Sequence, residues 1–220
     1  MRARWVLAAA LLVAFGAAVL VAGQRPPGPV PLPGVERLGP EPGEPVAHYT
    51  ERAAASLPTA GTGPGWALVQ FSDHLTARDA AEITRNVRLA RVVLRVPLGR
   101  VQTALVTRAV PGQCPEAEIA AGLRSAASAR SAAAAGSPPG SRSGAVAAAE
   151  AARLRDGCAC VVAALVHGDR AALSSVATQP QVRVVHAAEV GTPPSGLALA
   201  PLLPEQREVA GPVPDDGPVP

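Results

Sequence analysis

Three cysteines are the residues best suited to chemistry in this 220-residue chain. Cys158 and Cys160 stand two positions apart in an apolar run, and Cys114 precedes them by a long stretch of small residues. If that run is a strand, both side chains face the same side, and a bond between them would strain the backbone. We therefore predict a structural disulfide from Cys114 to either of the other two, in preference to free buried thiols or a metal or redox site.

Four histidines are the other candidates for chemistry. His74 follows Asp73, and such a pair could act in general acid–base catalysis. However, the sequence Ser72-Asp73-His74 is more typical of a turn before a helix. A cysteine metal site would need a fourth ligand, for which His167 is the nearest candidate, but the sequence has no C-x-x-C pair. Since His167 falls in a predicted turn, we interpret it as an exposed loop residue. His48 and His186 carry no motif. The sequence also lacks G-x-S-x-G, H-E-x-x-H and G-K-[ST] motifs, so we assign no catalytic, cofactor-binding or metal residue and expect no cofactor.

Composition restricts the function classes. All 20 basic residues are arginines, scattered among 17 acidic ones for a net charge of +3, and aromatic residues make up only 2% of the chain. A nucleic-acid-binding protein shows a clustered basic face or stacking aromatics, so this class is excluded. The hydrophobic core must consist of Ala, Val and Leu. The arginine bias and the many Pro, Gly and Ala residues indicate a GC-rich bacterial genome.

An uncharged stretch near the start predicts membrane attachment. Residues 5–23 carry no charge, and as a helix they would span about 28 Å, close to the thickness of the hydrocarbon layer. Arg2 and Arg4 precede them, so residues 1–4 are expected in the cytoplasm and the rest of the chain outside. An uncleaved single-pass anchor in the cell membrane is favoured over a cleaved signal and secretion, because the apolar run is long and its cleavage site is weak.

Proline-rich stretches divide the outer part of the chain. Residues 24–45 are predicted to form an extended stalk and residues 191–220 a disordered tail, which leaves one α/β domain over residues 46–190. Within it, residues 131–144 are an Ala/Gly/Ser/Pro run that we expect to be a mobile loop. The paired carboxylates Asp215 and Asp216 fall in the tail, where no pocket is expected.

The predicted domain repeats one plan. A strand, a helix and a strand follow one another over residues 66–96 and again over residues 158–188, with Thr76 and Asp169 as helix caps. Two such units predict the split βαβ of a ferredoxin-like α/β (α+β) sandwich, with helices on one sheet face and the other face open. Further elements are expected as helices over residues 46–57, 116–130 and 145–155 and a strand over 101–110. In the second strand, Arg91 and Arg95 alternate with Val92 and Leu94, so these two arginines are candidate interaction residues on the open face.

Two resemblances accompany this plan. The sequence WALVQFSDHLTARDAAEI and the segment from Cys158 to Val190, with Ala172, Leu173 and Val176 facing inward, resemble propeptide and inhibitor domains of the subtilisin type. This resemblance covers about 65 residues and implies a ferredoxin-like fold and binding to a protease. The whole chain also resembles membrane-anchored proteins of high-GC bacteria, which implies no particular activity.

These observations give three hypotheses for function. The first is a non-enzymatic protein-interaction or regulatory module that is attached to the membrane through residues 5–23 and binds another envelope protein. The second is an inhibitor or folding modulator of an envelope protease. The third is an enzyme whose residues converge only in space. The identity of the partner and the oligomeric state stay open.

Overall fold

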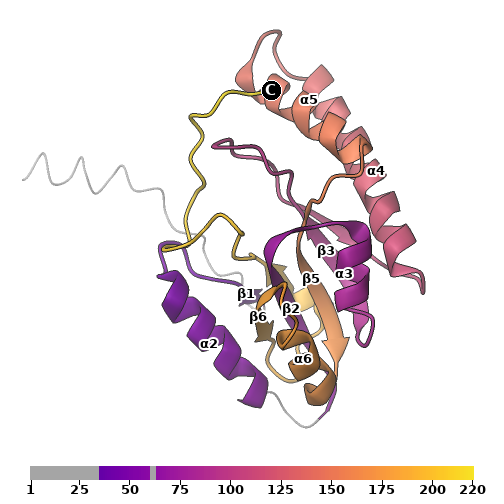
Figure 1. Cartoon of the computed structure of the whole chain (residues 1–220), viewed down its shortest axis with the longest axis vertical. Coiled ribbons are helices and arrows are strands. Elements are labelled where there is room, and N and C mark those ends of the chain that lie inside the picture. Colours follow the sequence, from indigo (N-terminus) through magenta and orange to yellow (C-terminus); the bar gives the residue numbers. More distant parts are fainter. Residues whose placement is uncertain (1–34, 60–62) are drawn as a thin grey trace, which may run out of the picture. The chain divides into compact units, whose positions relative to one another are not determined.

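The computed structural model describes residues 35–59 and 63–220, and its centre is a five-stranded antiparallel sheet with the strand order β4-β3-β5-β2-β6 (Figure 1). The strands are β2 (Gly65–Leu75), β3 (Arg88–Leu94), β4 (Val106–Ala109), β5 (Val161–Gly168) and β6 (Val182–Ala187). This confirms a mixed α/β fold of the α+β kind. The strand predicted over residues 101–110 is confined to β4, because the preceding residues form an irregular loop.

Helices cover one face of the sheet. These are α3 (Ala77–Ile83), α4 (Pro115–Ala135), α5 (Arg142–Arg155) and α6 (Arg170–Ala177). Alternate residues of β2, Ala67, Val69 and Phe71, point into the core that these helices share. The predicted caps are confirmed, since the Thr76 hydroxyl accepts from Asp79 N and the Asp169 carboxylate accepts from Ala172 N.

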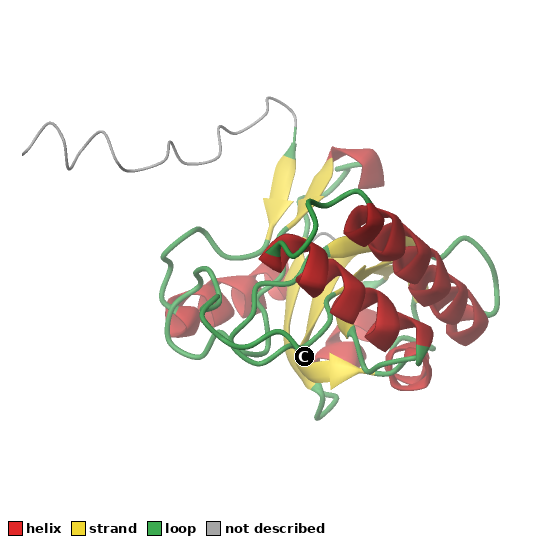
Figure 2. Cartoon of the chain, turned by 90° about the horizontal axis from the view of Figure 1, so that it is seen from above, coloured by secondary structure: helices red, strands yellow, loops and turns green. Residues whose placement is uncertain are grey.

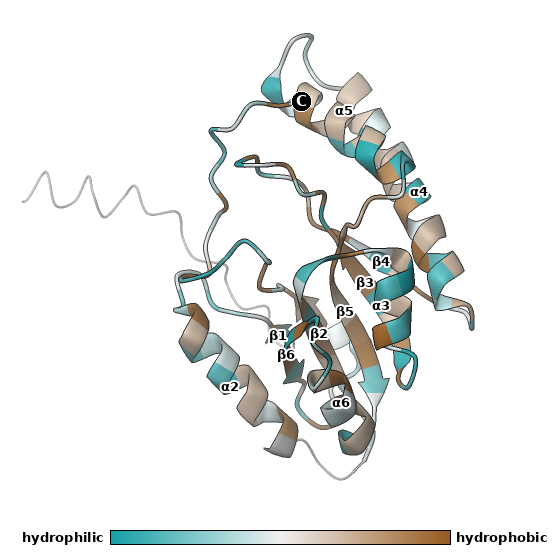
Figure 3. Cartoon of the chain, in the orientation of Figure 1, coloured by the Kyte–Doolittle hydropathy of each residue, from teal (hydrophilic) through white to brown (hydrophobic). Residues whose placement is uncertain are grey.

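The apolar run in β5 is explained by its central place. Residues 161–166 are all buried, because β5 lies between two other strands and both faces of the sheet are packed against other parts of the chain at this point. Figure 2 shows the sheet with long helices on one side and mostly loops on the other, and Figure 3 shows the hydrophobic colour concentrated on β3 and β5. The second face of the sheet is therefore not open, which contradicts the expectation from sequence.

The proline-rich C-terminal segment (residues 191–220) covers much of that second face, so the prediction of a disordered tail is wrong. Its strand β7 (Leu197–Leu199) pairs in parallel with β1 (Glu36–Leu38). Leu197, Leu202 and Leu203 are buried, the first and last against the sheet residues Leu68, Val93 and Leu165. Prolines prevent a helix here but allow an extended path, and the leucines supply the apolar area that holds this path against the sheet.

The end of the predicted stalk also packs. Leu38 in β1 is fully buried, and Gly43 N and Ala210 O are joined by a hydrogen bond of 2.7 Å. Gly39 follows β1 with a positive φ, and a Cβ there would lie 1.8 Å from the carbonyl oxygen of Ala200. Residues 35–45 are thus part of the domain, while residues 24–34 lie outside the described residues.

Two further helical regions complete the domain. Helix α2 (Val46–Thr59), predicted from its apolar stripe, packs Tyr49 and Ala53 against Val184 of β6 and the C-terminal segment. Helices α4 and α5 form a hairpin that contains most of residues 131–144, so the prediction of a mobile loop there is wrong. Alanine is the best helix former, and only the short turn between the helices holds the prolines of this run.

The described residues contain no helix that is both long enough and apolar enough to cross a bilayer. The predicted membrane segment, residues 5–23, lies outside residues 35–59 and 63–220.

Candidate functional site

A buried ion pair joins the sheet to the C-terminal segment. Arg95 follows β3 with only 2% of its side chain exposed, and its Nη1 donates to Glu205 Oε1 at 2.5 Å. The expectation that Arg95 is exposed on an open sheet face is therefore wrong, because the face toward which it points is covered. Its role as an interaction residue stays a prediction. Arg91, four residues earlier in β3, is half-buried. Arg95 Nη2 is buried and has no hydrogen-bond partner within the described residues.

His74 belongs to the same cluster. Its Nε2 lies 3.5 Å from Glu205 Oε1, and burial lowers the pKa of His74 against the opposing charge of Glu205. The neighbour considered in the sequence, Asp73, is exposed. The polar partner of His74 thus comes from a segment that sequence reasoning assigned to disorder.

A second buried polar network lies nearby. Gln70 Nε2 donates to Tyr49 Oη at 2.6 Å, while Gln70 Oε1 accepts from Leu202 N at 2.7 Å. Tyr49 Oη lies 3.3 Å from His186 Nδ1, which also accepts from Gly39 N. Burial raises the pKa of Tyr49 to about 12 and lowers the pKa of His186 to about 4. With these pKa values, Tyr49 and His186 are both neutral near pH 7. Their hydrogen bonds connect α2, the strands β2 and β6 and the C-terminal segment, so the network has a structural role.

The pKa of His186 predicts a loss of stability in acid. Its pKa falls from 6.5 to about 4 on folding, so between these values the unfolded chain binds a proton that the folded chain does not. Stability should be full above pH 6.5 and fall toward pH 4, with at most about 3 kcal/mol from this group. Chemical denaturation at several pH values measures it. His186→Asn should flatten this slope, whereas the exposed His48→Asn should leave it unchanged; equal slopes in all three proteins would contradict the assignment.

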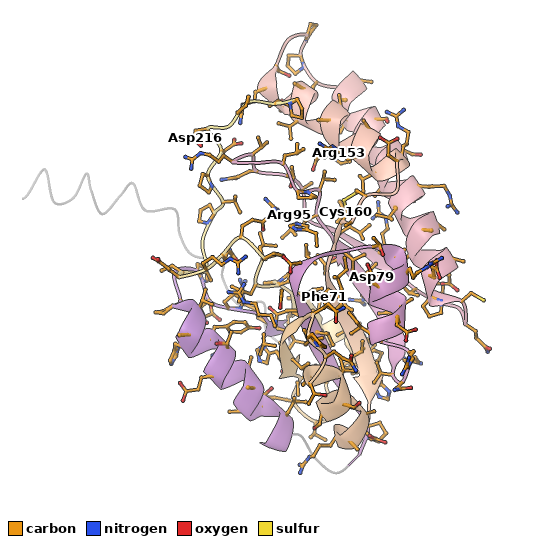
Figure 4. All side chains as sticks on the ribbon, in the orientation of Figure 1. Phe71, Asp79, Arg95, Arg153, Cys160 and Asp216 are labelled. Carbon is orange, nitrogen blue, oxygen red and sulfur yellow. A yellow bond between two sulfur atoms is a disulfide. The ribbon has the colours of Figure 1, made fainter. Side chains whose placement is uncertain are left out.

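A cleft opens beside the Arg95–Glu205 pair. Its volume is about 340 Å³, and it is lined by Arg95 and by three other parts of the chain, namely residues 37–42, residues 102–105 and the C-terminal segment. Its walls are largely proline and aliphatic side chains, among them Pro40, Leu105, Pro201 and Pro212. Its polar groups include two arginines, Arg37 and Arg95. Figure 4 shows Arg95 near the middle of the molecule, beside the C-terminal segment. The cleft thus combines apolar walls with a buried hydrogen-bond donor.

Hydrogen bonds fix the shape of this cleft. Gln206 Nε2 donates to Gly211 O at 2.6 Å, and Gln102 Nε2 donates to Val213 O at 2.9 Å. The carboxylate of Glu150, which is 1% exposed, accepts from Ala104 N at 2.7 Å and from Arg130 Nη2 at 2.5 Å. The α4–α5 hairpin therefore holds the loop that forms one wall of the cleft.

The cysteines differ from the sequence prediction. Cys158 is bonded to Cys160, and Cys114 is an exposed free thiol at the start of α4. The prediction assumed that a strand begins at Cys158, but β5 begins at Val161 and Ala159 lies in a bend, which lets the two cysteines meet with Cα atoms 5.4 Å apart. A bridge from Cys114 would have closed a loop of about 44 residues, worth roughly 4 kcal/mol, whereas this small ring is worth only about 1.5 kcal/mol.

The remaining histidines have local partners. His167 is half-buried within β5, so its interpretation as an exposed loop residue is wrong. Its ring lies against Trp66 with centroids 4.7 Å apart and the planes tilted by 55°, and the Arg88 guanidinium lies 5.1 Å from the centroid of the Trp66 ring. His48 Nδ1 is 3.0 Å from the Glu44 carboxylate, whose pKa Arg52 and other neighbours lower to about 2. Among residues 35–59 and 63–220, no group of His, Cys, Asp and Glu has the arrangement of a metal site.

Comparisons with known protein families, curated proteins and solved structures find no match to this chain. The site must therefore be interpreted from its own geometry. The residues that sequence reasoning missed are Glu150, Glu205 and Gln70, and none of them belongs to a motif. Only the leucines of the C-terminal segment gave a usable signal in the sequence, as an apolar group within a proline-rich tail.

Proposed function

We propose that the chain is a membrane-anchored, non-enzymatic protein-interaction or regulatory module on the outside of the cell, and that the cleft beside Arg95 is its binding site. The observation that carries this proposal is the construction of the cleft. Residues 37–42, residues 102–105, the C-terminal segment and Arg95 form it. Hydrogen bonds from Gly43 N to Ala210 O, from Ala104 N to Glu150 and from Arg95 to Glu205 hold these parts together. Such a concave site with apolar walls and a few oriented donors suits a side chain or a short extended segment of another protein.

The topology supports a ferredoxin-like core for this module. Across the sheet, four of the strands follow one another as β3, β5, β2 and β6, which are the second, third, first and fourth of these strands in chain order. All neighbours among them are antiparallel. Helix α3 connects the first pair and α6 connects the second, as in two interlocked β-α-β units. The α4–α5 hairpin and the C-terminal segment are additions to this plan.

The cleft replaces the open sheet face as the docking surface. A partner that docks on the bare sheet, an envelope protease included, would first have to displace the C-terminal segment and separate Arg95 from Glu205. The cleft needs no such displacement, and Leu105 at its border is 49% exposed. The cleft is therefore the better-supported surface, and protease inhibition is the weaker alternative.

The disulfide agrees with an outer location. Protein disulfides persist in oxidising compartments and are rare in the cytosol. Together with the uncharged segment over residues 5–23, this supports a single-pass protein whose described domain lies outside the cell membrane.

Site-directed photo-cross-linking in the native host tests the proposal. A photoreactive amino acid at Leu105 should yield a discrete cross-linked product with an envelope protein, while the same group at Val190, which is 75% exposed, should not. The captured protein should then bind the purified chain, and Leu105→Glu should weaken that binding by about tenfold or more, because it places a charge in an apolar wall. Val190→Glu is the matched control. Equal products from both positions, or binding that ignores Leu105→Glu, would remove the cleft as the binding site.

A further inference from the structure

We infer that the Cys158–Cys160 disulfide is a thiol–disulfide exchange site that opens in the folded protein, a role beyond the proposed binding function. The bridge spans a ring that holds only Ala159 between the two cysteines. A cross-link between residues so close in sequence removes little freedom from the unfolded chain, so it adds little to folding stability.

Backbone contacts hold both ends of this ring without the bridge. Cys158 N donates to Arg153 O at the end of α5, Cys160 N donates to Leu75 O at 3.0 Å, and Cys160 O accepts from Arg95 N at 2.8 Å. The segment would therefore keep its course after reduction. By thermodynamic linkage, a disulfide that adds little to the stability of the fold is in turn made only slightly harder to reduce by folding.

The two sulfur-bearing residues differ in access. Cys158 is partly exposed in the bend after α5, whereas Cys160 is fully buried against the core. Figure 4 marks Cys160 where the chain runs from α5 into the sheet. An incoming thiolate can thus reach Cys158 and not Cys160, which gives exchange at this bridge a single direction of attack.

The reaction partner is a dithiol, either a small molecule or an envelope protein. Its first thiolate attacks Cys158 Sγ, the bond between the two sulfurs breaks, and the electron pair stays on Cys160 Sγ, which takes up a proton from water. The second thiolate of the reductant then attacks the mixed disulfide and releases Cys158 as a thiol after protonation. The partner is oxidised to a disulfide and the bridge is reduced to two thiols, with two electrons and two protons transferred.

Alkylation of the folded full-length chain tests the inference. In a Cys114→Ser variant, which removes the exposed free thiol, a few minutes with millimolar dithiothreitol and no denaturant should reduce the bridge. After removal of the dithiothreitol, maleimide added together with denaturant should then label two thiols. The circular dichroism spectrum of the reduced chain, before denaturant is added, should be retained. A bridge that resists reduction until denaturant is added, or a domain that unfolds on reduction, would overturn the inference.

The direction of attack has its own test. With Cys114 replaced by Ser, the further variant Cys160→Ser keeps only Cys158, and Cys158→Ser keeps only Cys160. Oxidised glutathione should modify the first variant about tenfold faster or more than the second, because only Cys158 is accessible. Equal rates would contradict attack at Cys158, and the reduction experiment on the intact bridge stands even if one of these variants fails to fold.

Discussion

Leu202→Ala in the C-terminal segment should destabilise the domain by about 2–4 kcal/mol, because it leaves a cavity where a large aliphatic side chain was fully buried. Leu202 packs with Tyr49, Ala53 and Val184, and its amide donates to the buried Gln70. A residue in a disordered tail would have no such effect. Urea denaturation of the two proteins gives the difference in the free energy of unfolding.

Val209→Ala is the matched control for that experiment. Val209 lies in the same segment and is 51% exposed, so its replacement should change stability by less than about 0.5 kcal/mol. Equal and small effects of both substitutions would show that the segment does not pack on the sheet.

Glu150→Ala should destabilise the domain by about 3 kcal/mol. Its carboxylate is 1% exposed, and its removal would leave the guanidinium of Arg130 and the backbone N–H of Ala104 without their acceptor. Arg130 is 24% exposed and can recover part of its hydration, which limits the loss. Because Ala104 lies in the loop beside the cleft, the same substitution should also weaken binding at Leu105.

Glu82→Ala serves as the control for the charge. Glu82 in α3 pairs with Arg85 in the turn after this helix, and both side chains are 63% exposed, so the pair should contribute less than about 0.5 kcal/mol. Thermal unfolding of the two variants beside the parent protein measures the difference. A loss at Glu82 that equals the loss at Glu150 would contradict the assignment of Glu150 as a buried anchor.

The sequence predicted the parts of the fold that local patterns determine. The strand-helix-strand units around β2 and β5 follow from alternating apolar residues and from caps such as Thr76 and Asp169, which act within a few residues. Helix α2 follows from its apolar stripe. These signals are independent of where the rest of the chain lies.

The prediction failed where the contacts are distant in sequence. Composition alone indicated that the C-terminal segment is disordered, but its leucines pack on a sheet face that includes β2 and β3, which lie more than a hundred residues earlier in the chain. Leu203 belongs to the same cluster as Leu38 and Leu68. Arg95 was placed on the correct face of β3, yet its exposure depends on that same segment. The alternation of residues along a strand predicts the sheet face to which a side chain points, but it does not predict whether another segment buries that face.

The disulfide prediction failed for a local reason. A disulfide between two cysteines at this spacing would strain a regular strand. Here a hydrogen bond from Cys158 N to Arg153 O keeps the chain bent at the end of α5. The strand therefore starts only after Cys160. A three-residue error in the start of one strand therefore led to a predicted bridge from Cys114, which is a free thiol, in place of the bridge between Cys158 and Cys160.

Amide hydrogen exchange at Leu202 tests most directly the claim that the C-terminal segment belongs to the domain. The amide hydrogen of Leu202 is held by a buried glutamine, so its exchange should be as slow as that of amides in the central strand β5. Exchange at the rate of an unstructured peptide would contradict the covered sheet face, and with it the cleft.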